Sequence, residues 1–157
     1  MKVESQIIEL HVFRVCKSDP GDIEFLLLKR APAEIYPKLW QMVSGRVEEN
    51  ETGVNAALRE LREETGLTPK KLWVAPIVNS FYDPEADSVN VIPVFAAQVE
   101  RNCDVVLSDE HTQFKWATKR LAKSYLAWQG QRNAVDIIHE YFSKKKKILK
   151  FVEIETS

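Results

Sequence analysis

Three glutamates near the middle of the chain, Glu60, Glu63 and Glu64, have the spacing of a shared helix face. Residues three and four positions apart lie on the same side of an α-helix. Two like charges about 5 Å apart repel by roughly 3 kcal/mol at an effective dielectric constant of about 20. A positive partner should resolve this conflict, and hard divalent cations such as Mg²⁺ or Mn²⁺ prefer carboxylate oxygens. The cluster therefore predicts a metal site.

The alternative is a solvated acidic face on a surface helix, which is the common fate of a run of charges. Two features favour the metal site. Val54, Leu58 and Leu61 form an apolar stripe that would pack the helix on a sheet. Gly45 lies in the preceding turn, where the backbone can approach the carboxylates closely, as a metal–phosphate site requires.

The stretch from Gly45 to Leu67 resembles the Nudix box, which is a glycine, five residues, a glutamate, seven residues and then Arg-Glu-aliphatic-x-Glu-Glu-x-Gly-aliphatic. Every fixed position matches, including Glu51 and Arg59. The resemblance implies an α/β fold, the Nudix α/β/α sandwich with a mixed sheet. It implies one Nudix hydrolase domain over residues 1–157, with the box at residues 45–67. It also implies an enzyme that cuts a diphosphate linkage in a small nucleotide-like substrate.

The resemblance also assigns metal ligands. Glu60, Glu63 and Glu64 would bind the divalent ions, Mg²⁺ or Mn²⁺, and the Ser44 carbonyl would be a further ligand. Members of the family often begin the box with two glycines, whereas Ser44 precedes Gly45 here. This departure does not touch a carboxylate that the resemblance assigns to the metal.

Arg59 and Glu51 are expected to brace the loop against the helix, because a guanidinium can hold a carboxylate in a fixed two-point geometry. Asn50 stands where a glycine is common in the family. Since asparagine tolerates the left-handed backbone conformation, we expect the turn to be kept.

Bound metal ions would screen the diphosphate charge, polarise phosphorus and lower the pKa of a water molecule. A glutamate would then accept the proton of that water. The sequence leaves two candidates for this base, Glu60 in the box and Glu110 after it, and Glu110 could equally be a turn carboxylate. Glu63 and Arg59 complete the predicted catalytic residues. His111 is expected to be a structural neighbour of the base.

Several residues around the box could contact the substrate. Basic side chains that could meet the terminal phosphates are Lys29, Arg30, Lys38 and Arg46. Ordinary surface charge is the alternative for them. Trp40, Phe81 and Tyr82 could stack on a base or a pterin ring. Core packing is the preferred interpretation for Phe81 and Trp40.

A finer resemblance points to the dATP and dihydroneopterin triphosphate pyrophosphohydrolase branch. It is carried by the stretches Leu39–Gly45, Glu110–His111, Phe114–Trp116 and Gln131–Val135. It implies a nucleoside or pterin triphosphate that is cleaved to monophosphate and pyrophosphate. Diadenosine polyphosphate hydrolases, with a tyrosine near the position of Tyr82, and ADP-ribose hydrolases, with a proline near Pro84, remain alternatives. A non-catalytic Nudix-fold module that binds nucleotide is a further alternative.

The elements that must position these residues follow from hydrophobic periodicity. Strands are predicted at Ile7–Val15, Ile23–Lys29, Leu72–Phe81, Val89–Val99 and Phe114–Ala117, and helices at Thr52–Thr65 and Gln131–Lys145. Thr52 is the expected N-cap of the first helix, and Gly66 is its expected C-terminal stop. Residues 148–154 are left open as an extra edge strand or a dimer contact, so a homodimer is also left open.

Composition sets the remaining limits. The 157 residues are 45% apolar with a net charge of −1, which predicts one compact domain and gives no general attraction to nucleic acid or to an anionic membrane. No apolar run approaches the roughly 20 residues that span a bilayer. Cys16 and Cys103 lack zinc-type spacing, so a reducing cytoplasm is expected. The lysines at 144–147 are expected at a helix C-terminus.

Overall fold

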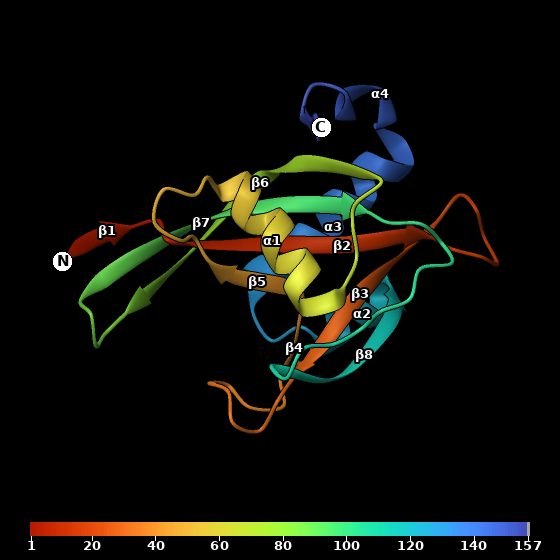
Figure 1. Ribbon diagram of the computed structural model, residues 1–157. Helices are drawn as coiled ribbons and strands as arrows, with labels where there is room; N and C mark the ends of the chain where they lie inside the picture. The colour runs from red at the N-terminus through yellow and green to blue at the C-terminus, as the bar shows by residue number, and fades with distance from the viewer. Residues whose placement is uncertain (157) are drawn as a thin grey trace.

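A computed structural model describes residues 1–156 and contains one mixed β-sheet with helices on both of its faces (Figure 1). The strands are β1 (Lys2–Glu4), β2 (Ile7–Val15), β3 (Ile23–Arg30), β4 (Trp40–Gln41), β5 (Val43–Arg46), β6 (Lys71–Asp83), β7 (Ser88–Gln98), β8 (His111–Thr118) and β9 (Glu153–Ile154). The helices are α1 (Gly53–Thr65), α2 (Lys119–Tyr125), α3 (Gln129–Lys144) and α4 (Lys146–Leu149). The predicted α/β sandwich with a mixed sheet is confirmed.

Strand β2 occupies the centre of the sheet. It pairs in parallel with β7, and antiparallel with β3 at one end and β5 at the other. Strand β3 lies between β4 and β8 and is antiparallel to both. Strands β6 and β7 form a long hairpin, to which β1 and β9 add short edges. The sheet therefore brings the end of β3, the strand β4 and the start of β8 together, although they are far apart in the sequence.

Helix α1 covers one face of the sheet. The Thr52 hydroxyl accepts a hydrogen bond from the Asn55 N–H at 3.1 Å, which makes Thr52 the N-cap. Gly66 ends the helix in the left-handed conformation, with φ at 72°, and its N–H donates to the Arg62 carbonyl. Leu61 is fully buried in the core beneath the helix, with the other residues of the predicted stripe around it. Both predicted ends of the helix are confirmed.

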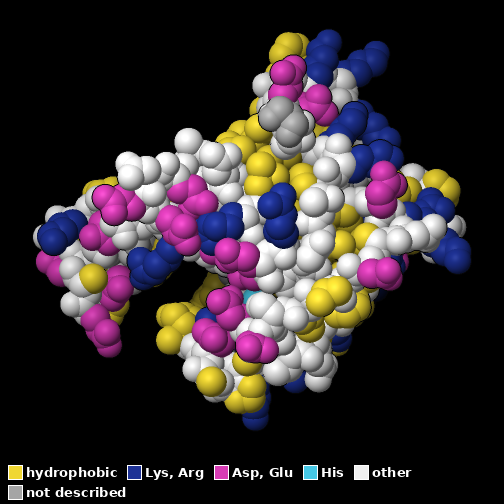
Figure 2. Space-filling model, viewed as in Figure 1, with side chains coloured by type: hydrophobic (Ala, Val, Ile, Leu, Met, Phe, Trp, Pro, Cys, Tyr) yellow, Lys and Arg dark blue, Asp and Glu magenta, His cyan; other side chains and the backbone are white. Residues whose placement is uncertain are grey.

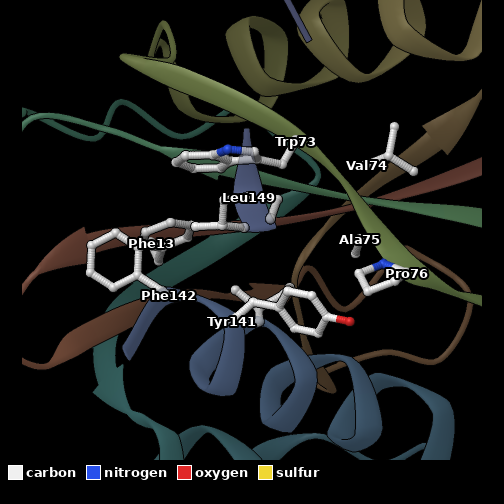
Figure 3. A pocket seen from close by; sticks show the side chains of 10 residues that line it. Phe13, Trp73, Val74, Ala75, Pro76, Tyr141, Phe142 and Leu149 are labelled. Atoms are coloured by element: carbon white, nitrogen blue, oxygen red, sulfur yellow. The ribbon is translucent and has the colours of Figure 1, made fainter. Parts of the chain in front are cut away.

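Helices α2 and α3 cover the opposite face. Val135, Ile138 and Phe142 of α3 are buried against the sheet, as their spacing predicted. Figure 3 shows a small apolar pocket beside this packing, where Trp73 of β6, Phe142 and Leu149 of α4 lie close together. No glutamate of the box lines this pocket. This end of the molecule is thus built by apolar packing.

Some elements depart from the prediction. Strand β1 and helix α2 were not predicted, because β1 is short and polar and Ala122 is the one buried residue of α2. Residues 148–154 form part of α4 and the two-residue strand β9, which pairs with β6 at Leu72 and Trp73, so the edge strand is correct only at its end. Within residues 1–156, none of the helices has the length and apolarity needed to cross a membrane.

Candidate active site

Gly45 on β5 lies directly against the Glu60 carboxylate on α1. A Cβ atom at Gly45 would overlap the Cδ and Oε1 atoms of Glu60. Gly45 pairs with Ile8 of the central strand β2, so β5 is fixed to the sheet beneath the helix. The close approach of the loop backbone to the carboxylates depends on the absence of a side chain at this position.

Arg59 ties the loop and the helix together. Its Nε and Nη2 atoms donate to the two oxygens of Glu51 at 2.8 and 2.9 Å. Its Nη1 atom donates to Glu60 at 2.7 Å and to Glu63 at 3.2 Å. Nη2 also donates to the Arg46 carbonyl at 2.8 Å. One guanidinium therefore fixes three carboxylates and the backbone of the loop in a single arrangement.

The electrostatics of the loop follow from these contacts. The Arg59 guanidinium, helped by a hydrogen bond from the Glu48 N–H, lowers the pKa of Glu51 to about 2. The same hydrogen bond to Glu51 raises the pKa of Arg59 above its usual value. Asn50 adopts the left-handed conformation with φ at 63°, as expected for an asparagine at a position where glycine is common. The turn is kept without the glycine.

The three clustered glutamates do not share one environment. The residue Glu64 is 2% exposed, whereas the Glu63 side chain is 58% exposed. Burial, and then the negative charges of Glu60 and Glu110, raises the pKa of Glu64 to about 9. Among residues 1–156, no group donates a hydrogen bond to the buried Oε2 atom of Glu64. A hard divalent cation would satisfy this oxygen and stabilise its charged form, so the ligand set fits such an ion.

Glu110, the residue before β8, joins this cluster from a part of the chain far from the box. One oxygen of Glu64, one oxygen of Glu110 and one ring nitrogen of His111 lie within 4.8 Å of one another. Burial is the main cause that raises the pKa of Glu60, and the Glu110 charge adds to it. Figure 2 shows acidic side chains on both sides of a recess that separates the β6–β7 hairpin from the lower part of the molecule. The box carboxylates and Glu110 thus form one negatively charged site.

A hydrogen-bonded network supports His111. The Arg30 Nη1 atom donates to Gln41 Oε1 at 3.1 Å, and the amide nitrogen of Gln41 lies 3.0 Å from His111 Nε2. Burial, reinforced by the Arg30 charge, lowers the pKa of His111 to about 4. Sequence reasoning missed Gln41. No local pattern marks it, because the network exists only when β4 and β8 pair with opposite edges of β3.

Comparison with known proteins identifies the family of this chain. The model of the NUDIX domain family matches residues 10–138, most of the chain. The chain belongs to the Nudix family. Among curated relatives, it is 33% identical over 128 residues to an octanoyltransferase of Myxococcus xanthus, covering 77% of this chain. It spans only 34% of that relative's length.

Two further relatives are named as asymmetrical bis(5'-nucleosyl)-tetraphosphatases. The protein from Caenorhabditis elegans is 34% identical over 61% of this chain and 68% of its own length. The protein from Mus musculus is 32% identical over 68% of this chain and 74% of its own length. Both names denote a hydrolase of a nucleotide tetraphosphate, which agrees with the prediction of a Nudix pyrophosphohydrolase.

Solved structures show the same fold. The Caenorhabditis elegans Ap4A hydrolase in a binary complex has a TM-score of 0.74 at 21% identity, covering 91% of this chain and 98% of that chain. The Escherichia coli dihydroneopterin triphosphate pyrophosphohydrolase has a TM-score of 0.64 at 23% identity, covering 83% of this chain and 94% of that chain. The Nudix fold that the box predicted is therefore confirmed.

Two of the predicted substrate residues lie on the other face of the Nudix sheet. Lys29 and Trp40 are paired across β3 and β4, and Trp40 packs against the core under α3. The Trp40 ring meets Tyr125 edge-on at 5.6 Å, and Lys115 Nζ lies over both rings at 4.5 and 4.0 Å. Core packing of Trp40 is confirmed, and the sheet separates it from the carboxylate cluster on the α1 side.

Arg30 makes several contacts within the chain. Besides its bond to Gln41, its Nε atom donates to the Ile35 carbonyl at 2.6 Å, and Nη2 lies 3.6 Å from Glu34. The guanidinium is thus held beside the β3–β4 loop, and its charge also acts on the pKa of Glu64. Arg30 stays a predicted phosphate contact. Lys38 and Arg46 are both exposed and remain predicted phosphate contacts.

The two aromatic residues at the hairpin tip are exposed. Core packing of Phe81 is wrong, because the residue is 47% exposed on β6. It lies beyond the part of the hairpin that α3 covers. Tyr82 is 52% exposed, and its hydroxyl donates to Asp87 at 2.9 Å in the tip of the hairpin. Tyr82 stays a predicted stacking residue.

Proposed function

We propose that this chain is a divalent-cation-dependent hydrolase of a phosphoanhydride bond in a nucleotide-like substrate. The observation that carries the proposal is the buried Glu64 carboxylate, which has an unpartnered oxygen beside Glu110 in a chain with every fixed residue of the box. A buried, unpaired carboxylate is costly unless a cation binds it. Glu60 and Glu63, with the Ser44 carbonyl, are the further proposed ligands.

The residues of the chain would divide the work. Arg59 holds Glu60 and Glu63 at fixed positions, so the site is organised before the substrate arrives. A bound Mg²⁺ or Mn²⁺ supplies charge screening of the diphosphate and polarises phosphorus. We assign proton removal from the attacking water to Glu110, since Glu110 is exposed whereas Glu60 already accepts a hydrogen bond from Arg59.

Two substrate classes follow from different observations. The sequence stretches around the box support a nucleoside or pterin triphosphate, cleaved to monophosphate and pyrophosphate. Two of the relatives above 30% identity are named as bis(5'-nucleosyl)-tetraphosphatases and support a dinucleoside tetraphosphate. Both classes present a polyphosphate chain to the same carboxylates. The exposed Arg46 and Lys38 are the proposed contacts for the phosphates that are not attacked.

Product analysis tests the proposal. Purified protein with Mg²⁺ or Mn²⁺ is given dATP, other nucleoside triphosphates, dihydroneopterin triphosphate, diadenosine tetraphosphate and ADP-ribose. Pyrophosphate release from triphosphates supports the first class, and cleavage of diadenosine tetraphosphate alone supports the second. Cleavage of ADP-ribose alone would overturn both substrate classes but keep the hydrolase.

The variant Glu63→Gln separates an enzyme from a binding module. Because the Glu63 side chain is 58% exposed, the substitution should leave the fold intact while abolishing turnover. Full activity in this variant would overturn the metal assignment. If the cations raise the thermal stability of the wild-type protein without any turnover of the panel, the chain is a binding module.

A further inference from the structure

His111 presents a buried ring nitrogen without a hydrogen-bond partner. The residue is 5% exposed, and among residues 1–156 no partner reaches its Nδ1 atom. The Oε2 atom of Glu64 is likewise buried and unpartnered, and the two residues belong to the same cluster with Glu110. Two neighbouring buried residues therefore each carry one polar atom without a partner. Each such group costs stability unless a partner is found.

The neighbours of His111 determine which ring nitrogen carries the proton. A guanidinium can only donate, so Gln41 must present its oxygen to Arg30, at 3.1 Å. The Gln41 amide nitrogen then faces His111 Nε2 at 3.0 Å, and an amide nitrogen can also only donate. Nε2 is therefore the acceptor. In the neutral ring, the proton must be on Nδ1.

We infer that His111 is a positioning residue: a small adjustment of the two unpartnered side chains would let its Nδ1–H group donate a hydrogen bond to Glu64 Oε2 and so orient this carboxylate for the cation. The inference rests on the proposed function, because Glu64 is a proposed metal ligand there. A protonated Nδ1 has no lone pair for a metal, so His111 acts through Glu64. Carboxylates that bind metals are commonly held by such outer hydrogen bonds.

Strand pairing brings the three residues of this network together. Arg30 is the last residue of β3. On one edge of β3, Gln41 of β4 pairs with Leu28. On the other edge, His111 of β8 pairs with Arg30. Gln41 pairs with Leu28 and Arg30 follows it by two positions, so both share the face of Leu28, which is buried beneath α1. A register shift between Lys29 and Arg30 lets His111 pair with Arg30 on this face. Three strands thus hold His111 beside the buried Glu64 of the box helix.

The first test is the tautomer of His111 in the metal-free protein. Long-range ¹H–¹⁵N NMR distinguishes the two neutral tautomers, and the chain has three histidines to assign. His111→Asn identifies the signals by their loss. We expect Nδ1 to carry the proton. A proton on Nε2 in the wild-type protein would overturn the inference.

The second test is Mn²⁺ affinity, measured from the EPR signal of free Mn²⁺. The Asn amide nitrogen takes the place of Nδ1, whereas the Gln amide nitrogen takes the place of Nε2. His111→Gln should therefore weaken Mn²⁺ binding by about 10–100-fold, and His111→Asn should stay within about threefold of the wild-type affinity. Equal loss in both variants would show a merely structural role and overturn the inference.

Two further outcomes separate this inference from the proposed function. A nitrogen hyperfine coupling to bound Mn²⁺ that disappears in His111→Gln would make His111 a direct ligand. It would overturn the hydrogen-bond role and leave the hydrolase proposal standing. No Mn²⁺ binding by the wild-type protein would overturn the proposed function, and the role of this hydrogen bond with it.

Discussion

Arg59 contacts both oxygens of Glu51, which lies eight residues earlier in the chain, at 2.8 and 2.9 Å. The pair closes the loop between β5 and α1 while the same guanidinium reaches Glu60. A loop that must approach the helix closely is therefore held by a charge-assisted contact with two parallel hydrogen bonds. Lysine cannot reproduce this geometry, since its ammonium group is a single point of charge.

Arg59→Lys should lower kcat/KM by about 10–100-fold, because the carboxylates that Arg59 orients would lose their fixed positions. Steady-state kinetics with the best substrate of the panel measures the loss. The control is Arg62→Lys, since Arg62 is exposed on the same helix. Activity of Arg59→Lys within threefold of the wild-type value would show that two-point geometry is unnecessary.

Gly45→Ala should reduce kcat by on the order of 100-fold, because the new Cβ would displace the Glu60 carboxylate with which it overlaps. Gly53→Ala is the matched control. A Cβ at Gly53 would lie 3.7 Å from Ile8 and Phe95, which is ordinary contact, at the first residue of α1. This control should keep its activity and gain about 0.5–1 kcal/mol in the free energy of unfolding. Equal activity of the two variants would contradict the close approach.

Much of the site could be predicted because its signals are local. The spacing of the box glutamates, the cap at Thr52 and the left-handed Gly66 all lie within about one helix and its ends. The spacing of the apolar residues in α1 likewise predicts which face of the helix is buried. Such features depend on neighbours three or four residues away, which the sequence shows directly.

Features that depend on strand pairing could not be predicted in the same way. Gln41 and His111 are 70 residues apart, and they meet because both flank β3. The different environments of Glu63 and Glu64 also depend on what the helix packs against. Phe81 has the pattern of a buried strand residue, but it lies on hairpin surface that no helix covers. The alternating pattern of a strand does not show how far along that strand a covering helix extends.

Buried His11 should make the protein less stable as the pH falls below about 6.5. Burial lowers the pKa of His11 to about 4, so between pH 6.5 and 4 the unfolded chain binds a proton that the folded chain does not. The free energy of unfolding then falls by up to about 1.4 kcal/mol per pH unit in this window. Glu9, two residues earlier, has its pKa raised by burial, and its contribution runs in the opposite direction with pH.

The variant His11→Leu isolates this contribution from that of Glu9. Urea unfolding of both proteins between pH 4.5 and 7.5 gives the difference in the free energy of unfolding at each pH. The wild-type protein should lose stability relative to the variant as the pH falls below 6.5. Parallel curves across the window would show that His11 is protonated equally well in the folded and unfolded chains.

Glu110→Gln and Glu60→Gln identify the catalytic base. If Glu110 removes the proton from water, Glu110→Gln should lower kcat by about 10²–10⁴-fold and abolish the acidic limb of the pH–rate profile. The Mn²⁺ affinity of Glu110→Gln should change less than that of Glu60→Gln, because Glu60 is a proposed metal ligand. Arg59 Nη1 already holds the Glu60 carboxylate, at 2.7 Å from Oε1. The reverse result would assign the base to Glu60. Glu110, which the β8 strand brings beside the buried Glu64, would then act only through its charge.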